Sequence, residues 1–520
     1  MNKLLTYSIL IGFILCSHLA RGLPIHKNQG RTYFVSNNGN DKNQGSESKP
    51  FRTIGRVNQL KLKPGDAIYF KGSDVFPGTL ALTLNGDKGN EILISSYGNG
   101  RAILFGGARK SMTLRGQHFK VSNIDARGSG RKNGNTTAGV HLIKANEVLI
   151  EDMTIEGFQK AGLRMYSCRN ADVKKILARN NGFSGIFVTG SKISESGNIL
   201  IQDCMAENNP GDPTNHENHS GNGILVHMSR NVTIDHCTAT NNGWDMPRLG
   251  NGPIGIWAYN SDSVAIQYCI AYRNRTHKGA MDGGGFDLDG GVTNSVIQYC
   301  LSYENEGAGY GLFQYAGANL WYNNVVRYCI SINDAVSTEG SGGIFVWNSS
   351  EDSVQLADCM IYNNLVYSTY APAVQFEKRS LNKNFQFVNN IFIGKNRIVD
   401  GPSSGERFSG NVWWSAEGDL LFRQCGSFQE WCVETGQEML NGRIIGRLVD
   451  PQLKGPLLTQ LTDPYLLKTL IGYQLRDSSP LRNVGLDLKS MFNIQYGFRD
   501  FFDNPVPAGS GPEPGVHELN

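Results

Sequence analysis

The sequence predicts an all-β fold: a right-handed single-stranded parallel β-helix of about ten coils, with an N-terminal cap and an irregular C-terminal segment. Cysteines recur at intervals of 33, 32, 31, 29 and 30 residues along the middle of the chain. Each cysteine follows a short alternating apolar strand, and no long stretch carries the apolar period of an amphipathic helix. The repeating cysteines are Cys204, Cys237, Cys269, Cys300, Cys329 and Cys359.

Each repeat contains a second short strand upstream of its cysteine strand. This strand begins at a small residue and then alternates apolar and other residues, as in Gly223–His227 and Gly285–Asp289. Because neighbouring side chains of a strand point to opposite sides, Phe286 and Leu288 should pack inside the coil. Asp287 and Asp289 should then point outward.

The cysteines are expected to form a column of buried thiols inside the helix. Adjacent coils lie about 4.8 Å apart, whereas a disulfide needs Cβ atoms about 3.8 Å apart. Free buried cysteine behaves as a small apolar residue. The same column should contain Ile124, Met153, Ile176 and Ile391. Cys425 and Cys432 lie outside it and form the one pair suited to a disulfide.

The chain divides into four predicted segments. Residues 1–22 combine Lys3, an apolar run over 4–16 and a small-residue tripeptide, which is the layout of a secretory signal peptide. Residues 23–110 are assigned to the N-terminal cap and first coils, 111–395 to the β-helix core, and 396–520 to the last coils and C-terminal capping segment. We expect a secreted protein, extracellular or periplasmic, with no membrane span because the apolar run is too short.

The two ends of the mature chain resemble those of a known group of proteins. The N-terminal segments 33–41 and 49–54, together with the C-terminal segments 479–485, 500–505 and 514–518, are similar to secreted bacterial pectate-lyase-like right-handed parallel β-helix proteins. The resemblance implies the fold but not one reaction, because this superfamily includes lyases, glycoside hydrolases, epimerases, esterases and adhesive fibres.

The outward positions of the upstream strands form two columns with many aromatic residues. The first column is predicted to contain Phe187, Leu225, Trp257, Asp287, Phe313, Phe345 and Gln375. The second is predicted to contain Thr189, His227, Tyr259, Asp289, Tyr315, Trp347 and Glu377. Exposed aromatic patches mark binding surfaces, and sugar rings stack on them. The alternative is that the long preceding loops fold over this face and bury the rings.

From these columns we expect a set of substrate-binding residues on the outer face. They are His227, Trp257, Tyr259, Phe313, Tyr315, Trp347 and Glu377. The preceding loops also carry many titratable residues, among them His216, His219, Asp245, Arg248, His277, Lys278, Asp282 and Glu339.

Asp287 and Asp289 are the main candidates for chemistry. Two carboxylates on one face of a strand lie about 6.5–7 Å apart. With Asp282 or Glu306 they could bind Ca²⁺, while Lys278 or His277 removes the proton beside a uronate carboxylate. Without metal, they could act as the acid and base of an inverting glycosidase. A structural Ca²⁺ or a hydrogen-bonded turn is the remaining alternative.

The leading hypothesis is an extracellular lyase that cleaves an acidic, uronate-containing polysaccharide by β-elimination, with Ca²⁺ as a possible cofactor. A glycoside hydrolase that uses Asp287 and Asp289 is one alternative, and a non-catalytic glycan-binding or adhesion β-helix is another. Without the signal peptide the formal charge falls from +3 to +1, so we expect no nucleic-acid partner. The expected partner is a polysaccharide, bound by a monomer.

Overall fold

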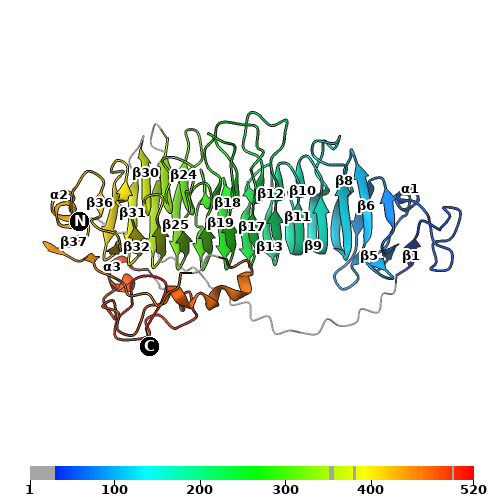
Figure 1. Ribbon diagram of the computed structural model, residues 1–520. Coiled ribbons are helices and arrows are strands. Elements are labelled where there is room, and N and C mark those ends of the chain that lie inside the picture. The colour runs from blue at the N-terminus through cyan, green and yellow to red at the C-terminus, as the bar shows by residue number, and fades with distance from the viewer. Residues whose placement is uncertain (1–29, 351–355, 379–381, 458–459, 495–496, 520) are drawn as a thin grey trace, which may run out of the picture.

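The computed structural model describes residues 30–350, 356–378, 382–457, 460–494 and 497–519. The predicted signal peptide, residues 1–22, lies outside these ranges. The chain winds into a long parallel β-helix, with the N-terminal segment at one end and the C-terminal segment along one side of the later coils (Figure 1). Both the β-helix and its parallel pairing are as predicted.

Three stacks of parallel strands form the walls of the helix, and the first stack carries the upstream strands. Its strands are β4 (Leu80–Asn85), β7 (Met112–Ser122), β9 (Val140–Glu156), β10 (Ala161–Tyr166), β12 (Ser184–Thr189), β15 (Asn222–His227), β18 (Ile254–Tyr259), β21 (Gly284–Leu288), β24 (Tyr310–Gln314), β27 (Ile344–Asn348), β30 (Val374–Lys378), β33 (Arg397–Asp400) and β36 (Leu421–Phe422).

The second stack carries the strands that precede the cysteines, and it shares the long strands β7 and β9 with the first. Its other strands are β1 (Thr32–Val35), β2 (Ala67–Lys71), β5 (Ile92–Tyr97), β11 (Arg169–Arg179), β13 (Gly197–Gln202), β16 (Arg230–Asp235), β19 (Asp262–Gln267), β22 (Val296–Gln298), β25 (Trp321–Arg327), β28 (Leu356–Tyr362), β31 (Lys383–Val388) and β34 (Glu406–Ser409).

The third stack follows directly after the cysteine corner, and the sequence pattern did not reveal it because most of its strands have only three or four residues. It shares β9 and β11 with the second stack. Its other strands are β3 (Val75–Pro77), β6 (Ala102–Gly107), β8 (Ile124–Gly128), β14 (Met205–Glu207), β17 (Thr238–Thr240), β20 (Ile270–Tyr272), β23 (Leu301–Tyr303), β26 (Ile330–Ile332), β29 (Leu365–Ser368), β32 (Ile391–Gly394), β35 (Val412–Trp414) and β39 (Arg447–Leu448).

Short elements lie outside the coils, near the two ends and in the C-terminal segment that runs along one side (Figure 1). Within the described residues these are the helices α1 (Ile54–Val57), α2 (Phe428–Thr435) and α3 (Leu488–Phe492), the 3₁₀ helices η1 (Pro464–Thr469) and η2 (Ile471–Tyr473), and the antiparallel pair β37 (Met439–Leu440) and β38 (Arg443–Ile444). No described helix has the length and apolar character needed to cross a membrane.

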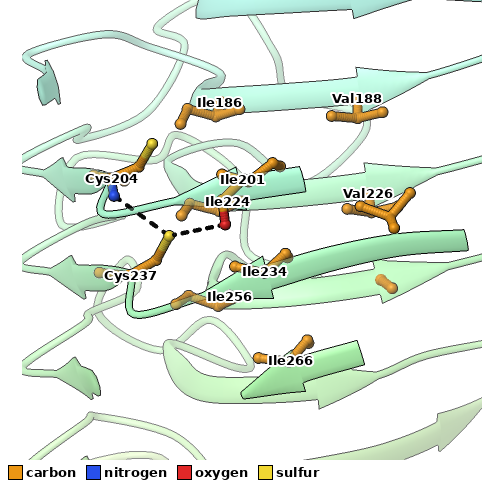
Figure 2. Packing of buried hydrophobic residues seen from close by; sticks show 14 of the residues in the cluster. Ile186, Val188, Ile201, Cys204, Ile224, Val226, Ile234, Cys237, Ile256 and Ile266 are labelled. Carbon is orange, nitrogen blue, oxygen red and sulfur yellow. Dashed lines mark hydrogen bonds between the residues drawn. The ribbon is translucent and has the colours of Figure 1, made fainter. Parts of the chain in front are cut away.

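The interior of the coil is filled by the inward side chains of facing stacks. Figure 2 shows Ile186, Ile224 and Ile256 of the first stack beside Ile201 and Ile234 of the second. All five are buried. Removing branched aliphatic surface from water is the main favourable contribution to such a core, so the alternation of the sequence fixes which side of each strand faces outward.

The cysteine column is confirmed for five residues and corrected at its end. Cys204, Cys237, Cys269, Cys300 and Cys329 are buried free thiols, and the Cys204 amide donates to Cys237 Sγ at 3.4 Å. After Cys329 the acceptor is an asparagine, because the Cys329 amide donates to Asn364 Oδ1 at 2.9 Å.

Two residues assigned to this column therefore lie elsewhere. Cys359 lies within β28, where it pairs with Asn324 and Phe385. Ile391 is the first residue of β32, and Asn390 before it occupies the column position. The Asn364 side chain donates to Asn390 Oδ1, and the Asn390 side chain donates to Asn411 Oδ1. The expected disulfide is also absent, because Cys425 and Cys432 are free thiols.

The C-terminal segment covers the third stack through a second apolar cluster. Tyr299 and Tyr328 stack at 5.6 Å between ring centroids. The Tyr299 hydroxyl donates to the Arg499 carbonyl at 3.0 Å, and the Tyr303 hydroxyl donates to the Leu461 carbonyl at 3.2 Å. This face is thereby closed by the chain itself, whereas the outer face of the first stack is bordered by long loops (Figure 1).

Candidate functional site

A cavity of about 710 Å³ lies on the outer face of the first stack. Its floor comes from the outward residues of β18, β21, β24 and β27, and its rim comes from the loops that precede these strands. A volume of this size is typical of ligand-binding pockets. The described lining residues include Glu217, His219, Arg248, Trp257, Tyr259, Asp282, Asp287, Asp289, Phe313, Tyr315, Glu339, Phe345, Trp347 and Glu377.

The strand β21 and the residue after it place two carboxylates in this cavity, as predicted. Phe286 and Leu288 are fully buried in the core of the coil. Asp287 lies in register with Trp257 of β18 and with Gly311 of β24. Asp289 follows the strand directly, with its own amide donating to the carbonyl of Ala258 at 2.9 Å. Alternation along the strand turns both carboxylates to the cavity side.

Asp287 is a buried carboxyl group with an unsatisfied oxygen. Its side chain is 1% exposed, and Oδ1 accepts no hydrogen bond from any described residue. Burial, together with the nearby carboxylates of Asp289 and Asp282, holds the pKa of Asp287 well above its usual range. This environment favours the protonated form of Asp287, which is the form that can donate a proton.

The two neighbouring carboxylates lie in related environments. Burial and the charge of Asp282 raise the pKa of Asp289, and the Gly290 amide, which donates to Oδ1 at 2.6 Å, opposes this rise. Burial raises the pKa of Asp282 to about 6, opposed by the Gly252 amide, which donates to Oδ2 at 2.7 Å. The three groups cannot all ionise without mutual repulsion.

In the coils that precede β21, the strand that carries Asp287, the loops do fold over the aromatic residues of the outer face. His219 is 3% exposed and meets the Trp257 ring edge-on at 4.8 Å. Trp257 is also 3% exposed, and its Nε1–H donates to Asn222 Oδ1 at 3.1 Å. Trp257 and Tyr259 still line the cavity. The loops thus bury these rings from bulk water, as the alternative predicted, but they leave Trp257 and Tyr259 in contact with the cavity.

His227 lies deeper in the same aromatic cluster and does not line the cavity. Its ring stacks on Tyr259 at 4.1 Å, and its Nδ1 lies 3.0 Å from Thr189 Oγ1. Burial lowers the pKa of His227 to about 4, so the ring is neutral at physiological pH. The structure gives it a packing role beneath Tyr259.

On the C-terminal side, the predicted columns need one correction of register. Phe313 pairs with Trp347, and Gly311 pairs with both Asp287 and Phe345. Gly311 therefore occupies the first-column position assigned to Phe313, and Phe313 belongs to the second column. Gly309 and Gly311 both fit the small residue that begins each strand, so the sequence placed this coil two residues out of register.

The correction moves Tyr315 beyond its strand, although it remains at the cavity. Its hydroxyl accepts from Asn260 Nδ2 at 3.0 Å. Phe313, Phe345 and Trp347 form the downstream wall, with Phe313 edge-on to Phe345 at 5.3 Å and to Trp347 at 6.2 Å. Glu377 pairs with Trp347 in the next coil and is exposed at the far end of the cavity.

Besides His227, three further predicted site residues are not brought to the cavity. Lys278 is exposed and His277 is half-buried in a turn, where its carbonyl accepts from Ala280 at 2.8 Å. Neither lines the cavity. Glu306 lies away from the aspartates because its carboxylate accepts from the Thr276 amide at 2.8 Å and pairs with Arg275 at 3.3 Å.

The structure brings three of the four predicted calcium ligands to the cavity. Among the described residues, no three or more His, Cys, Asp and Glu side chains are grouped to hold a metal ion. Of the four predicted ligands, Asp282, Asp287 and Asp289 share the cavity, but Glu306 does not. Calcium binding therefore stays a prediction without geometric support, and no catalytic step is assigned to it.

Loop residues supply the part of the site that the strands could not reveal. Arg248, His219 and Glu339 come from three different loops and line the cavity. Contacts with earlier coils position two of these loops: Asp245 forms an ion pair with Lys132 at 2.6 Å, and the buried Asp212 accepts a hydrogen bond from Gln159 Nε2 at 3.0 Å. The density of titratable residues in these loops was the signal available in the sequence.

Comparison with known proteins identifies the family of this β-helix. A model of the Pel9A-like right-handed β-helix region matches residues 33–329, a range that includes the acidic strand. The chain belongs to the Pel9A-like β-helix family. No curated protein matches the chain.

Several solved structures resemble this Pel9A-like protein in fold. The GH136 lacto-N-biosidase from Eubacterium ramulus is 18% identical, with 68% of each chain covered and a TM-score of 0.48. Pectate lyase Pel9A is 16% identical, covering 94% of this chain and 96% of its own, with a TM-score of 0.40. A PL6 family alginate lyase is 14% identical, covering 71% and 52%, with a TM-score of 0.46. At these identities the likeness concerns the β-helix alone.

Proposed function

We propose that this protein is a secreted glycoside hydrolase, acting as a monomer on a glycan that carries no uronate at the point of cleavage. The observation that carries the proposal is the buried, unsatisfied carboxyl of Asp287 beside Asp289 in an aromatic-walled cavity. In an inverting glycosidase one carboxyl protonates the leaving oxygen and the second activates water. The separation of about 6.5–7 Å expected for this strand spacing lies in the range of inverting enzymes.

The raised pKa of Asp287 assigns the two roles. Asp287 has no hydrogen-bond donor at Oδ1, and burial favours its protonated form, so it is the general acid that protonates the glycosidic oxygen. Asp289 accepts from the Gly290 amide, which favours its ionised form. Asp289 is then the base that removes a proton from the attacking water.

The charge of the cavity favours an uncharged sugar over a uronate. Six of the described lining residues are acidic, and Arg248 is the sole lysine or arginine among them. Even with Asp287 protonated, an anionic sugar would meet the negative charges of other lining carboxylates, which costs free energy. The base predicted for β-elimination is also missing from the lining, because Lys278 and His277 lie elsewhere.

The experiment is a product analysis of the purified protein on pectate, alginate and neutral plant glycans, with and without EDTA. We expect new reducing ends from a neutral glycan, no absorbance of an unsaturated uronide, and no loss of rate in EDTA. Asp287→Asn and Asp289→Asn should abolish the activity. Full activity in both variants would contradict the proposal.

β-Elimination is the second candidate, and one observation favours it. Arg248 lines the cavity, and a guanidinium pairs well with a carboxylate, so a uronate could bind there. Unsaturated products from pectate or alginate would contradict the proposed hydrolase and support a lyase. Binding of a glycan without any product would instead identify the non-catalytic glycan-binding alternative.

A further inference from the structure

The first outward column changes abruptly after Asp287. Trp257 precedes it and Phe345 follows two coils later, but between them the position beside Asp287 is Gly311. The column therefore has a single coil without a side chain, directly next to the proposed acid. The backbone conformation at position 311 does not require glycine, because its φ lies outside the left-handed region. The requirement for glycine must therefore come from the neighbouring atoms that occupy the place of a side chain.

The ring of Phe313 occupies that space together with the Asp287 carboxyl. A Cβ atom on Gly311 would lie 2.7 Å from Phe313 Cζ, 2.8 Å from Phe313 Cε2 and 3.0 Å from Asp287 Oδ1. The ring edge and the unsatisfied oxygen therefore share one small volume above Gly311. Phe313 is 7% exposed, and Phe345 and Trp347 hold it edge-on from the next coil.

An apolar ring in this place changes what surrounds the carboxyl. Oδ1 has less than one square ångström of accessible surface and accepts no hydrogen bond from the described residues. A carboxyl held against an aromatic ring and away from water favours its neutral form. The ring of Phe313, which comes from the next coil, is thus one physical cause of the burial of the Asp287 carboxyl.

The charged groups around Asp287 come from every neighbouring element. Asp289 directly follows the strand of Asp287, and Asp282 lies on the loop that leads into that strand. Arg248, His219 and Glu339 extend from the other loops to line the same cavity. Burial lowers the pKa of His219 to about 3, so this ring is neutral. Asp289 and Asp282 push the pKa of Asp287 in the same direction as the burial does.

We propose that Gly311 and Phe313 are positioning residues that keep water from the Asp287 carboxyl and hold it in its proton-donating form. Gly311 provides the space and the ring of Phe313 fills it. The inference rests on the proposed function for its catalytic meaning. Its physical content concerns one carboxyl group and can be measured without a substrate.

The test is a pH titration of the Asp287 carboxyl by infrared difference spectroscopy. The protonated-carboxyl band is assigned by its loss in Asp287→Asn. In Phe313→Ala, water reaches the carboxyl, so the band should disappear at a pH at least about one unit lower than in the wild type. Phe313→Leu, which keeps apolar bulk, should fall between the two. Equal titration in all three proteins would overturn the proposal.

Gly311→Ala tests the other half of the pair. Its methyl group displaces the ring edge, so the titration should shift in the direction seen for Phe313→Ala. Gly55→Ala is the matched control, because its Cβ would meet Thr53 Oγ1 at an ordinary 3.5 Å. A shift in Phe313→Ala without one in Gly311→Ala would remove Gly311 from the proposal. Should Gly311→Ala fail to fold, the two Phe313 variants still decide it.

Phe187→Ala is the control for loss of a ring, since Phe187 lies on the first outward column, as Asp287 does, but does not line the cavity. It should titrate as the wild type does. Where a hydrolysed substrate is found, the high-pH limb of the rate profile should move to lower pH in Phe313→Ala. Full activity of Asp287→Asn would refute the proposed function, while the infrared titration would still report on Gly311 and Phe313.

Discussion

Asp287 and Glu438 are both buried carboxyl groups of this β-helix, and they differ in what surrounds their oxygens. Glu438 is 0% exposed near the C-terminal end of the coils. It accepts from the Asn411 side chain at 2.8 Å, from the Asn411 amide at 3.2 Å and from Trp413 Nε1 at 3.1 Å. Burial raises the pKa of Glu438 to about 7, and these donors oppose the rise.

Asp287 has comparable burial but lacks such donors at Oδ1. The carboxyl of Glu438 joins the last coils to the cap, since its side-chain donors Asn411 and Trp413 lie just before β35 and within it. The carboxyl of Asp287 faces a cavity. Burial alone therefore does not distinguish a structural carboxyl from a reactive one, whereas the set of hydrogen-bond donors does.

The sharpest difference is expected from Asp287→Asn. Removing a general acid lowers kcat by about 10²–10⁴-fold. Stability should stay equal or rise, because Oδ1 has no hydrogen-bond donor to lose and the repulsion from Asp289 and Asp282 is removed. The measurement is kcat on the cleaved glycan together with the thermal midpoint. A loss of stability that parallels the loss of activity would make Asp287 a structural residue like Glu438.

The converse result is expected from Glu438→Gln. The glutamine side chain has an NH₂ group where the glutamate has an oxygen, and this group would face the N–H donors of Asn411 and Trp413. Buried donors are then left without an acceptor, which lowers the free energy of unfolding by about 2 kcal/mol. Denaturant unfolding at about pH 8 should show this loss, with unchanged kcat per folded molecule. An activity loss with intact stability would instead connect the cap to the site.

A third variant uses pH to separate burial from bonding. The pKa of Asp282 is raised to about 6 when folded, above its value in the unfolded chain. Its favourable contribution is thus complete at low pH and is lost as pH rises through about 6. Asp282→Asn keeps an acceptor for the Gly252 amide, so its stability relative to wild type should improve by about 1–2 kcal/mol between pH 4 and pH 8.

Urea unfolding at the two pH values is the measurement for this variant, and Asp463→Asn, an exposed N-cap residue in η1, is its control. The control should show little change in this difference. A pH-independent effect of Asp282→Asn would mean that its carboxyl titrates normally and that the cavity is open to water.

The smallest effect concerns two tryptophans that repeat the same contrast. Trp413 is fully buried and bonded to Glu438, whereas Trp347 lines the cavity. Trp347→Ala should raise KM by roughly tenfold through lost sugar stacking, with little change in the thermal midpoint. An unchanged KM would remove the downstream wall from substrate binding.

The sequence could predict those site residues whose side is determined by strand alternation. Strand alternation placed Asp287 and Asp289 on the outer face, because shifting either residue would expose Phe286 and Leu288. It could not place Phe313 in its coil, since Gly309 and Gly311 both fit the start of the strand and leave the alternation unchanged.

Loop residues were beyond reach for a different reason. Glu306 was grouped with the aspartates by sequence proximity, but Arg275 and the Thr276 amide hold it elsewhere. His219 enters the cavity because its loop is anchored through Asp212 to Gln159 of an earlier coil. Such anchors depend on tertiary pairing across tens of residues, which no local pattern encodes.

The most direct test of the account is a crystal structure of Asp287→Asn with an oligosaccharide of the glycan that the wild type cleaves. We expect sugar rings between Trp257 and Trp347, with a glycosidic oxygen beside the residue 287 side chain. A glycan bound away from β21, or a cavity sealed by its loops with the ligand outside, would contradict the proposed roles of both carboxylates.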